Sequence, residues 1–312
     1  MCMRRSIALA SALVVAAAFA ASTHASPVGV SVRTWTIHYL AHDGFVRPAY
    51  VLLPAWYGPR DHPPIPLVIS PHGRGMDARV NARLWGDLPA VGRFAVVNPE
   101  GQGRRLKLFS WGDPGQIADL ARMPTIVEQA LPWLHIDPHR IYAFGGSMGG
   151  QETLLLVAHH PHLLAGAAAF DAPTNMIARY RSFEDLPNGA ALQQLATYEI
   201  GGTPMVDRSA YLARSPIDVA RRIAFSGVPL QIWWSYNDKI VVDQEQESGL
   251  LYREIKKLNP DAPVVEVVGY WAHTVEMTAW TRLPIALGRF GLLPTNDAHF
   301  GFGHSLPRAQ DV

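Results

Sequence analysis

Residues 145–150 read Gly-Gly-Ser-Met-Gly-Gly, and this run contains the serine best placed to act as a nucleophile. An apolar, strand-like run precedes it at 140–144, and a helix-like run follows at 151–158. A serine between glycines on a strand-to-helix turn is held in a sharp bend that only neighbours without side chains permit. The bend exposes the hydroxyl, so the spacing predicts that Ser147 attacks a substrate.

An acid and a histidine follow Ser147, each just after a predicted strand. They matter because a chain with 26 glycines can contain such a turn by chance. Asp238 follows the apolar run 228–234, and His273 follows the β-branched run 264–268. A histidine can withdraw the serine proton during attack, while an aspartate fixes the imidazole tautomer and stabilises the imidazolium. The three residues predict hydrolysis through a covalent acyl-enzyme.

Asp171 is an alternative to Asp238 as the acid. It follows the apolar run 166–170, so it also lies at the end of a predicted strand, from which a carboxylate could reach the same histidine. Some hydrolases use an acid at that position. We favour Asp238, and the sequence leaves Asp171 open.

The order serine, acid, histidine is that of α/β-hydrolases and differs from the chymotrypsin and subtilisin orders. Over roughly residues 45–290 the chain resembles this superfamily, and more narrowly the catalytic domain of the prolyl oligopeptidase family. The resemblance rests on the glycine turn at 145–150, Arg-Ser-Pro at 214–216, the acid loop 238–241 and the histidine run 269–273. It implies a serine hydrolase that needs no cofactor.

The resemblance also implies where the developing oxyanion is held. In these enzymes the first donor lies on a turn after a buried strand, which here is the His72-Gly73 turn after the run 66–70, so we expect the backbone N–H of Arg74. The second donor is expected to be the N–H of Met148, at the start of the predicted helix. Loss of one such donor typically costs about 3–4 kcal/mol of transition-state stabilisation.

Departures from the family pattern concern the substrate. Family peptidases usually have a tyrosine after the nucleophile and a His-Gly pair before the acid loop, where this chain has Met148 and Trp234-Ser235. No propeller repeats precede the hydrolase region, so small esters are expected at least as much as short peptides. Secreted feruloyl esterases and polyester depolymerases look similar at this level. A secreted binding protein that keeps the fold without turnover is the alternative from another class.

Strand-like and helical runs alternate along the chain, which predicts an α/β fold: a mostly parallel central sheet with helices on both faces. We expect one catalytic domain over 26–295 and an antiparallel pair near 32–39 and 47–53. The long connection at 172–227 predicts a helical lid, with four aromatic residues that either line the substrate pocket or pack within the lid: Tyr180, Phe183, Tyr198 and Tyr211. The segment 106–113 is expected to approach the carboxyl ends of the strands.

The first 25 residues predict a cleaved secretory leader, since Arg4 and Arg5 precede an apolar run too short for a membrane span. We expect a secreted or periplasmic protein without a stable membrane anchor, and the sequence leaves the Sec and twin-arginine routes open. The tail 296–312 lacks helical or strand periodicity.

Charge and cysteine content narrow the expected partners. The formal net charge of +1 argues against a polyanion-binding surface, so no nucleic-acid partner is expected. The single cysteine, Cys2, falls in the leader, and no Cys and His set has metal-ligand spacing, so no disulfide, metal or other cofactor is predicted. The expected partner is a small ester or short peptide substrate, and the sequence says nothing about oligomeric state.

Overall fold

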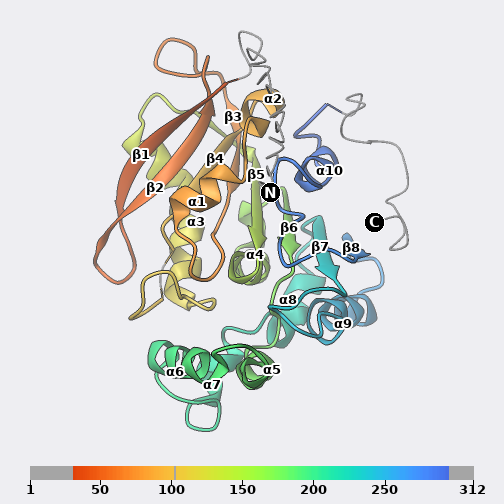
Figure 1. Cartoon of the computed structure of the whole chain (residues 1–312). Coiled ribbons are helices and arrows are strands. Elements are labelled where there is room, and N and C mark those ends of the chain that lie inside the picture. Colours follow the sequence, from red (N-terminus) through yellow and green to blue (C-terminus); the bar gives the residue numbers. More distant parts are fainter. Residues whose placement is uncertain (1–30, 102, 295–312) are drawn as a thin grey trace, which may run out of the picture.

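The computed structural model describes residues 31–101 and 103–294 (Figure 1). Its centre is one eight-stranded sheet with the strand order β1-β2-β4-β3-β5-β6-β7-β8. The strands are β1 (Val32–Leu40), β2 (Val46–Pro54), β3 (Ile65–Ile69), β4 (Ala95–Pro99), β5 (Ile136–Gly146), β6 (Gly166–Phe170), β7 (Leu230–Ser235) and β8 (Val264–Gly269). β2 runs antiparallel to β1 and β4, and the other neighbouring pairs are parallel. The predicted strands and the antiparallel pair are confirmed.

Helices cover both faces of the sheet, as expected for parallel strands that read as continuous apolar runs. In β3, Leu67 and Ile69 point to one face, where they pack with α3 (Pro114–Ala130), α4 (Met148–His159), α8 (Ala220–Ala224) and α9 (Leu250–Leu258). Val68 points to the other face, where it packs with α1 (Ala78–Arg83), α2 (Leu88–Gly92) and α10 (Leu283–Gly288). The two cores hold the carboxyl ends of β5, β7 and β8 in fixed positions.

The connection between β6 and β7 forms a helical insertion. It contains α5 (Met176–Ser182), α6 (Gly189–Ile200) and α7 (Arg208–Leu212), which lie together at one end of the molecule (Figure 1). These helices share a small apolar core with Trp111. Phe183 and Tyr211 are fully buried in that core, and Tyr180 packs edge-on against Tyr211, whereas Tyr198 is 56% exposed. Three of the four predicted aromatics therefore pack within the insertion.

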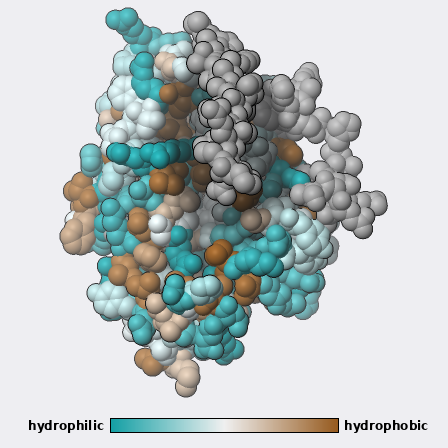
Figure 2. All heavy atoms as spheres, viewed as in Figure 1, coloured by the Kyte–Doolittle hydropathy of each residue, from teal (hydrophilic) through white to brown (hydrophobic). Residues whose placement is uncertain are grey.

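The surface of the described residues is mixed in character. On the face shown in Figure 2, apolar residues lie among polar ones. Across the described ranges, none of the helices is both long and apolar enough to cross a membrane. The predicted leader at 1–25 and the predicted tail at 296–312 lie outside the described residues.

Candidate active site

Ser147 occupies the sharp turn between β5 and α4. Its backbone has φ 57° and ψ −124°, a conformation that residues with side chains rarely adopt. Hydrogen bonds hold the turn on both sides: the Ser147 N–H donates to the Phe170 carbonyl at 2.8 Å, and the Ser147 carbonyl accepts from the Gln151 N–H at 3.0 Å. The neighbouring structure thus imposes the strained geometry predicted for this serine.

The glycines around Ser147 allow backbone segments to approach closely. A Cβ on Gly145 would overlap the Gly149 carbonyl, and a Cβ on Gly149 would overlap the Pro71 carbonyl. The start of α4 therefore packs directly against the turn that follows β3. This contact requires the absence of a side chain at both positions, which is the physical reason for the Gly-x-Ser-x-Gly spacing here.

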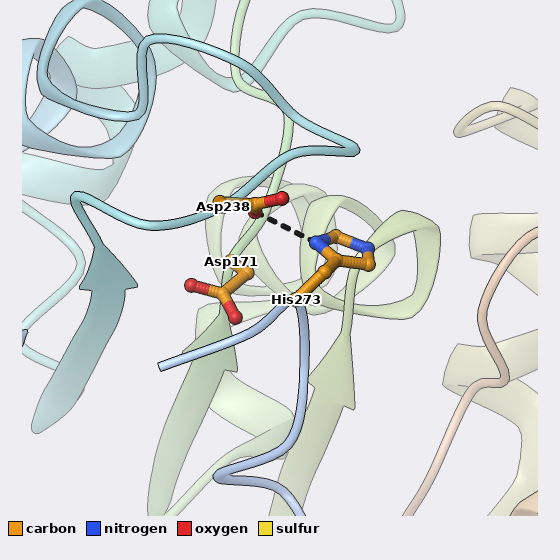
Figure 3. A group of neighbouring side chains, drawn as sticks. All are labelled: Asp171, Asp238 and His273. Atoms are coloured by element: carbon orange, nitrogen blue, oxygen red, sulfur yellow. Dashed lines mark hydrogen bonds and ion pairs between the residues drawn. The ribbon is translucent and has the colours of Figure 1, made fainter. Parts of the chain in front are cut away.

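His273 and Asp238 form a direct pair (Figure 3). His273 Nδ1 lies 2.7 Å from Asp238 Oδ2, and Asp238 is 5% exposed. The other Asp238 oxygen accepts from the N–H groups of Ile240 and Val241 at 2.8 and 2.9 Å, and Gln244 Nε2 donates to Oδ2 at 3.1 Å. Burial works to raise the pKa of Asp238, but the hydrogen bond to His273 and the two N–H groups outweigh it and lower the pKa. The acid is therefore held as a carboxylate.

Asp171 lies beside this pair but bonds to the neighbours of His273 in the chain (Figure 3). Its carboxyl accepts from Trp271 Nε1 at 3.1 Å and from the Thr274 N–H at 2.7 Å. Burial, together with the negative charge of Asp238, raises the pKa of Asp171 to about 8 despite these bonds. The geometry favours Asp238 as the partner of the imidazole and gives Asp171 the task of bracing the loop that carries it.

Ser147 and the histidine loop share one pocket. Its lining includes Gly73, Ser147, Thr274 and Met277, and Thr274 directly follows His273. A Cβ on Gly146 would lie 3.1 Å from Thr274 Cγ2, so the end of β5 already touches the histidine loop. The four aromatics of the helical insertion are not in this lining. The suggestion that they line the pocket around the serine is therefore not supported.

The two expected oxyanion donors flank Ser147. A Cβ on Gly73 would lie 3.8 Å from Ser147 Cβ, which puts the turn that carries Arg74 over the serine. Met148 is the first residue of α4, where an N–H has no acceptor within the helix and the helix dipole favours negative charge. Both N–H groups are thus positioned on the backbone segments next to the nucleophile.

His72 supports this turn through its ring. Its Nδ1 lies 2.9 Å from the Gly73 carbonyl, and its Nε2 accepts from the Gly101 N–H at 2.9 Å. These partners assign the hydrogen to Nδ1, and burial lowers the pKa of His72, which keeps the ring neutral. His72 thus links the turn after β3 to the loop after β4. The sequence marked the His-Gly turn but not this role, because Gly101 is 29 residues away.

The loop after β4 approaches the turn that carries Ser147, residues 145–150, which we call the elbow; this was predicted. The Leu108 carbonyl accepts from the Gly75 N–H at 3.0 Å, and the Trp111 N–H lies 3.3 Å from Met148 Sδ. Leu108 and Trp111 thus place this loop beside the turn after β3 and the start of α4.

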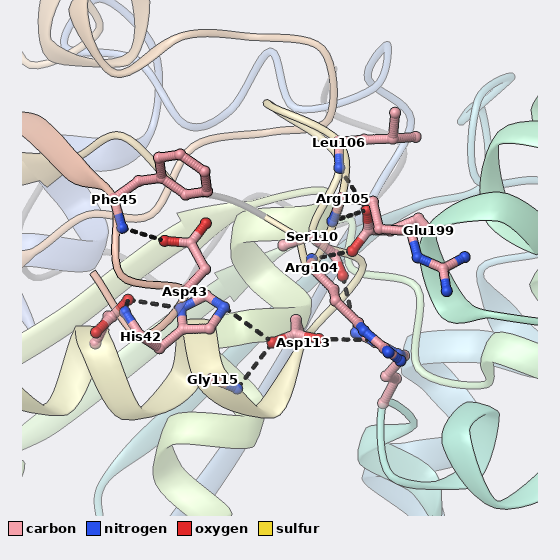
Figure 4. A network of polar contacts seen from close by, with 12 residues as sticks. His42, Asp43, Phe45, Arg104, Arg105, Leu106, Ser110, Asp113, Gly115 and Glu199 are labelled. Atoms are coloured by element: carbon pink, nitrogen blue, oxygen red, sulfur yellow. Dashed lines mark hydrogen bonds and ion pairs between the residues drawn. The ribbon is translucent and has the colours of Figure 1, made fainter. Parts of the chain in front are cut away.

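A buried glutamate from the insertion anchors the same loop (Figure 4). The Glu199 carboxylate accepts from three consecutive backbone N–H groups, those of Arg104, Arg105 and Leu106; the last two bonds are 2.7 and 2.6 Å long. Burial raises the pKa of Glu199 although the three N–H groups oppose the shift. Sequence reasoning missed this contact, because a single glutamate on a predicted helix carries no signal of such a partner.

One group of acidic and histidine side chains within the described ranges has ligand atoms close enough to hold a metal ion. Asp171, Asp238 and His273 each offer one atom, all within 4.8 Å of one another. In this group, however, the Asp171 oxygens receive N–H donors from Trp271 and Thr274, and His273 Nδ1 faces Asp238. This donor pattern suits proton transfer better than ligation of a cation.

Comparison with known proteins agrees with the fold. The model of the prolyl oligopeptidase family matches residues 116–270. This range includes Ser147 and Asp238, together with the strands β5 and β7 that precede them, and ends just before His273. A fungal esterase from Rhizomucor miehei superposes with a TM-score of 0.60 and 16% identity, over 84% of this chain and 83% of the esterase chain. The chain has the α/β-hydrolase fold.

Two further matches cover only part of the longer protein. Pyrococcus horikoshii acylaminoacyl peptidase superposes with a TM-score of 0.59 and 16% identity, over 79% of this chain and 39% of the peptidase. A poly(3-hydroxyalkanoate) depolymerase C from Paucimonas lemoignei is 33% identical over 110 residues, which is 33% of this chain and 27% of that protein. The chain thus spans well under half the length of the peptidase and of the depolymerase.

Proposed function

We propose that this α/β-hydrolase is an exported serine hydrolase that cleaves a carboxylic ester through an acyl-enzyme on Ser147. The observation that carries the proposal is the short bond between His273 and Asp238 on a loop that shares a pocket with the strained Ser147. The match to the prolyl oligopeptidase family and the likeness to esterases support the same class of chemistry.

Each residue has a defined task in the proposed reaction. Asp238 accepts the Nδ1 hydrogen of His273, which leaves Nε2 as the base that takes the proton from the Ser147 hydroxyl. The serine oxygen then attacks the acyl carbon, and the N–H groups of Arg74 and Met148 stabilise the oxyanion. The imidazolium returns the proton to the leaving alcohol, and water hydrolyses the acyl-enzyme by the same steps.

An ester is the favoured substrate. Among the similar structures, the Rhizomucor miehei esterase is covered over 83% of its chain and an S-formylglutathione hydrolase from Staphylococcus aureus over 99% of its chain. The depolymerase match also names an enzyme that acts on a polyester. A peptidase is the second candidate, because the family model is that of the prolyl oligopeptidases.

The test uses the purified protein and its Ser147→Ala variant on nitrophenyl esters from acetyl to long acyl, beside aminoacyl and Pro-containing nitroanilides. We expect turnover of esters that falls by about six orders of magnitude in kcat in the variant. The matched control is Ser226→Ala, which should keep the rate. Ser226 lies just after α8, and its hydroxyl donates to the Ile223 carbonyl.

The outcomes separate the candidates. Turnover of the anilides at rates comparable to the esters supports the peptidase, and full activity in Ser147→Ala contradicts the assignment of the nucleophile. Absence of turnover on both substrate series supports a binding protein with a hydrolase fold. Labelling of Ser147 by a fluorophosphonate, read by peptide mass, reports the nucleophile independently of substrate choice.

A further inference from the structure

Two arginine side chains lie together on the insertion side of the elbow. Arg74 extends from the oxyanion turn, and Arg179 extends from α5. Both guanidinium carbons lie over the same Phe183 ring, at 5.8 and 4.7 Å from its centroid. Arg74 directly follows Gly73, on which a Cβ would lie 3.8 Å from Ser147 Cβ, so the backbone that carries Arg74 lies next to the nucleophile.

The positive charges of the arginine pair lack carboxylate partners. Within the described residues, neither Arg74 nor Arg179 forms an ion pair; Arg74 Nη1 is buried without a hydrogen-bond partner, and Arg179, 3% exposed, donates from Nη1 to the Ser182 hydroxyl at 3.3 Å. Arg214, another buried arginine, differs from the arginine pair because it forms an ion pair: its Nη2 lies 2.7 Å from Asp113 Oδ2.

The acids nearest to the arginine pair are engaged elsewhere. Asp238 faces His273, and the Glu247 carboxylate accepts from the N–H groups of Thr174 and Asn175 at 2.7 and 2.8 Å. The negative charges of Glu247 and Asp238 raise the pKa of Arg179, but neither carboxylate forms an ion pair with it in the described part of the chain.

The electrostatic consequence is visible at both arginines. Burial lowers the pKa of Arg74, and burial together with the positive charge of Arg74 lowers the pKa of Arg179 to about 10. Buried like charges without a counter-ion cost free energy, and such arrangements cluster at functional sites. An oxyanion placed against the arginine pair would remove this cost.

We propose that the arginine pair binds a carboxylate of the substrate, so that the preferred substrate is an ester that also carries a free carboxylate close to the scissile bond. Guanidinium groups match a carboxylate with two parallel N–H donors and are weakly hydrated, which suits them to this task in a partly buried site. The proposal rests on the ester hydrolase function proposed above and specifies its substrate.

The experiment compares matched substrates. One pair is mono-4-nitrophenyl adipate and its methyl ester, which put the carboxylate on the acyl side; the other is 4-acetoxybenzoate and its methyl ester, which put it on the leaving side. The measured quantity is the ratio of kcat/KM for the anionic substrate to that for the neutral one. Wild type should prefer the anion in at least one pair.

The variants locate the source of that preference. Arg179→Met and Arg74→Met should each lower the ratio by about 10- to 100-fold, the worth of a hydrogen bond to a charged group. Arg221→Met is the matched control, because Arg221 is exposed on α8 and lies 5.2 Å from the Phe225 ring, and it should leave the ratio unchanged. Thermal unfolding of each variant checks that the fold is retained.

The result that overturns the proposal is a wild-type ratio at or below one in both substrate pairs, or a preference that persists in both arginine variants. An equal loss in Arg221→Met also overturns it, since the effect would then come from net charge. Failure of the proposed function itself is distinct, because it removes Ser147-dependent turnover of the neutral esters. If Arg179→Met unfolds, Arg179→Lys, which keeps the charge but not the planar fork, tests the same ratio.

Discussion

Ser147 combines a strained backbone with the proposed role of nucleophile, and the strain is informative. A residue held in such a conformation costs about 1–3 kcal/mol and persists only where its surroundings over-determine it. Here the hydrogen bonds to Phe170 and Gln151 supply that constraint. The fold therefore sacrifices stability at this residue to present the hydroxyl to the pocket.

The two acids near His273 should differ sharply when mutated. We expect Asp238→Asn to lower kcat on a nitrophenyl ester by about 10⁴-fold, because the amide favours the wrong imidazole tautomer. Asp171→Asn keeps an oxygen that can accept from Trp271 and Thr274, so its kcat should fall by less than about tenfold. Steady-state kinetics of both variants decides the assignment, and the opposite ranking would make Asp171 the triad acid.

Asp171 should also make stability depend on pH. Its pKa of about 8 in the folded protein lies above the value of about 3.9 expected in the unfolded chain, so the folded state binds this proton more tightly. The stabilisation is complete below about pH 4 and is lost as the pH rises toward 8. We therefore expect the free energy of unfolding of wild type to fall as the pH rises from 5 to 9. The fall should be smaller for Asp171→Asn, as measured by urea unfolding at pH 5, 7 and 9.

Glu152→Gln is the comparison for that experiment. Burial raises the pKa of Glu152 to about 8, so its titration adds to the same fall. If the free energy of unfolding of Asp171→Asn depends on pH in the same way as that of wild type, Asp171 is ionised in the folded protein.

At the scale of elements, the strand-to-loop positions of the site residues could be predicted, and the contacts between distant loops could not. Ser147, Asp238 and His273 each follow a run that forms a strand in the structure, so the pattern of residue types was sufficient to predict these positions. Glu199 and Arg179 lie on short helices of an insertion whose packing depends on tertiary contacts. No local pattern marks a glutamate that meets backbone N–H groups 93–95 residues away.

The contact between α6 and the loop after β4 predicts a change in proteolysis. In Glu199→Ala three backbone N–H groups lose their acceptor, which should loosen the segment that contains Arg104 and Arg105. Trypsin should cut after these arginines faster than in wild type, as read by peptide mass. Glu254→Ala, which removes an exposed pair with Lys257, should leave the cleavage rate unchanged, and equal rates in all three proteins would argue against an anchoring role.

At the scale of the whole molecule, one sheet carries the proposed chemistry and one insertion carries the proposed recognition. The sheet holds the elbow and the His273 loop between two apolar cores. The insertion has its own core, contacts the loop after β4 through Glu199, and places Arg179 on the same Phe183 ring as Arg74. We propose that the insertion acts as a lid, in the sense that it forms the wall opposite the histidine loop.

The predicted leader gives a test at the same scale. When the full chain is expressed in a bacterium, we expect removal of about the first 25 residues, because small residues at Thr23 and Ala25 suit cleavage there. Intact-mass analysis of the secreted or periplasmic protein should place its first residue near Ser26. Recovery of uncleaved chain in the cytoplasm would contradict the proposed export.

The bonds from Glu199 to residues 104–106 also bear on how such a protein can diversify. A chimaera that exchanges only the helical insertion would separate this carboxylate from the backbone it anchors and would leave Trp111 without its small core. Residues 103–111 and the insertion must therefore be exchanged together, although residues 112–171 separate them in the sequence. Recombination that moves both segments together preserves a working wall, and this coupling limits which sequences can confer a new specificity on the same elbow.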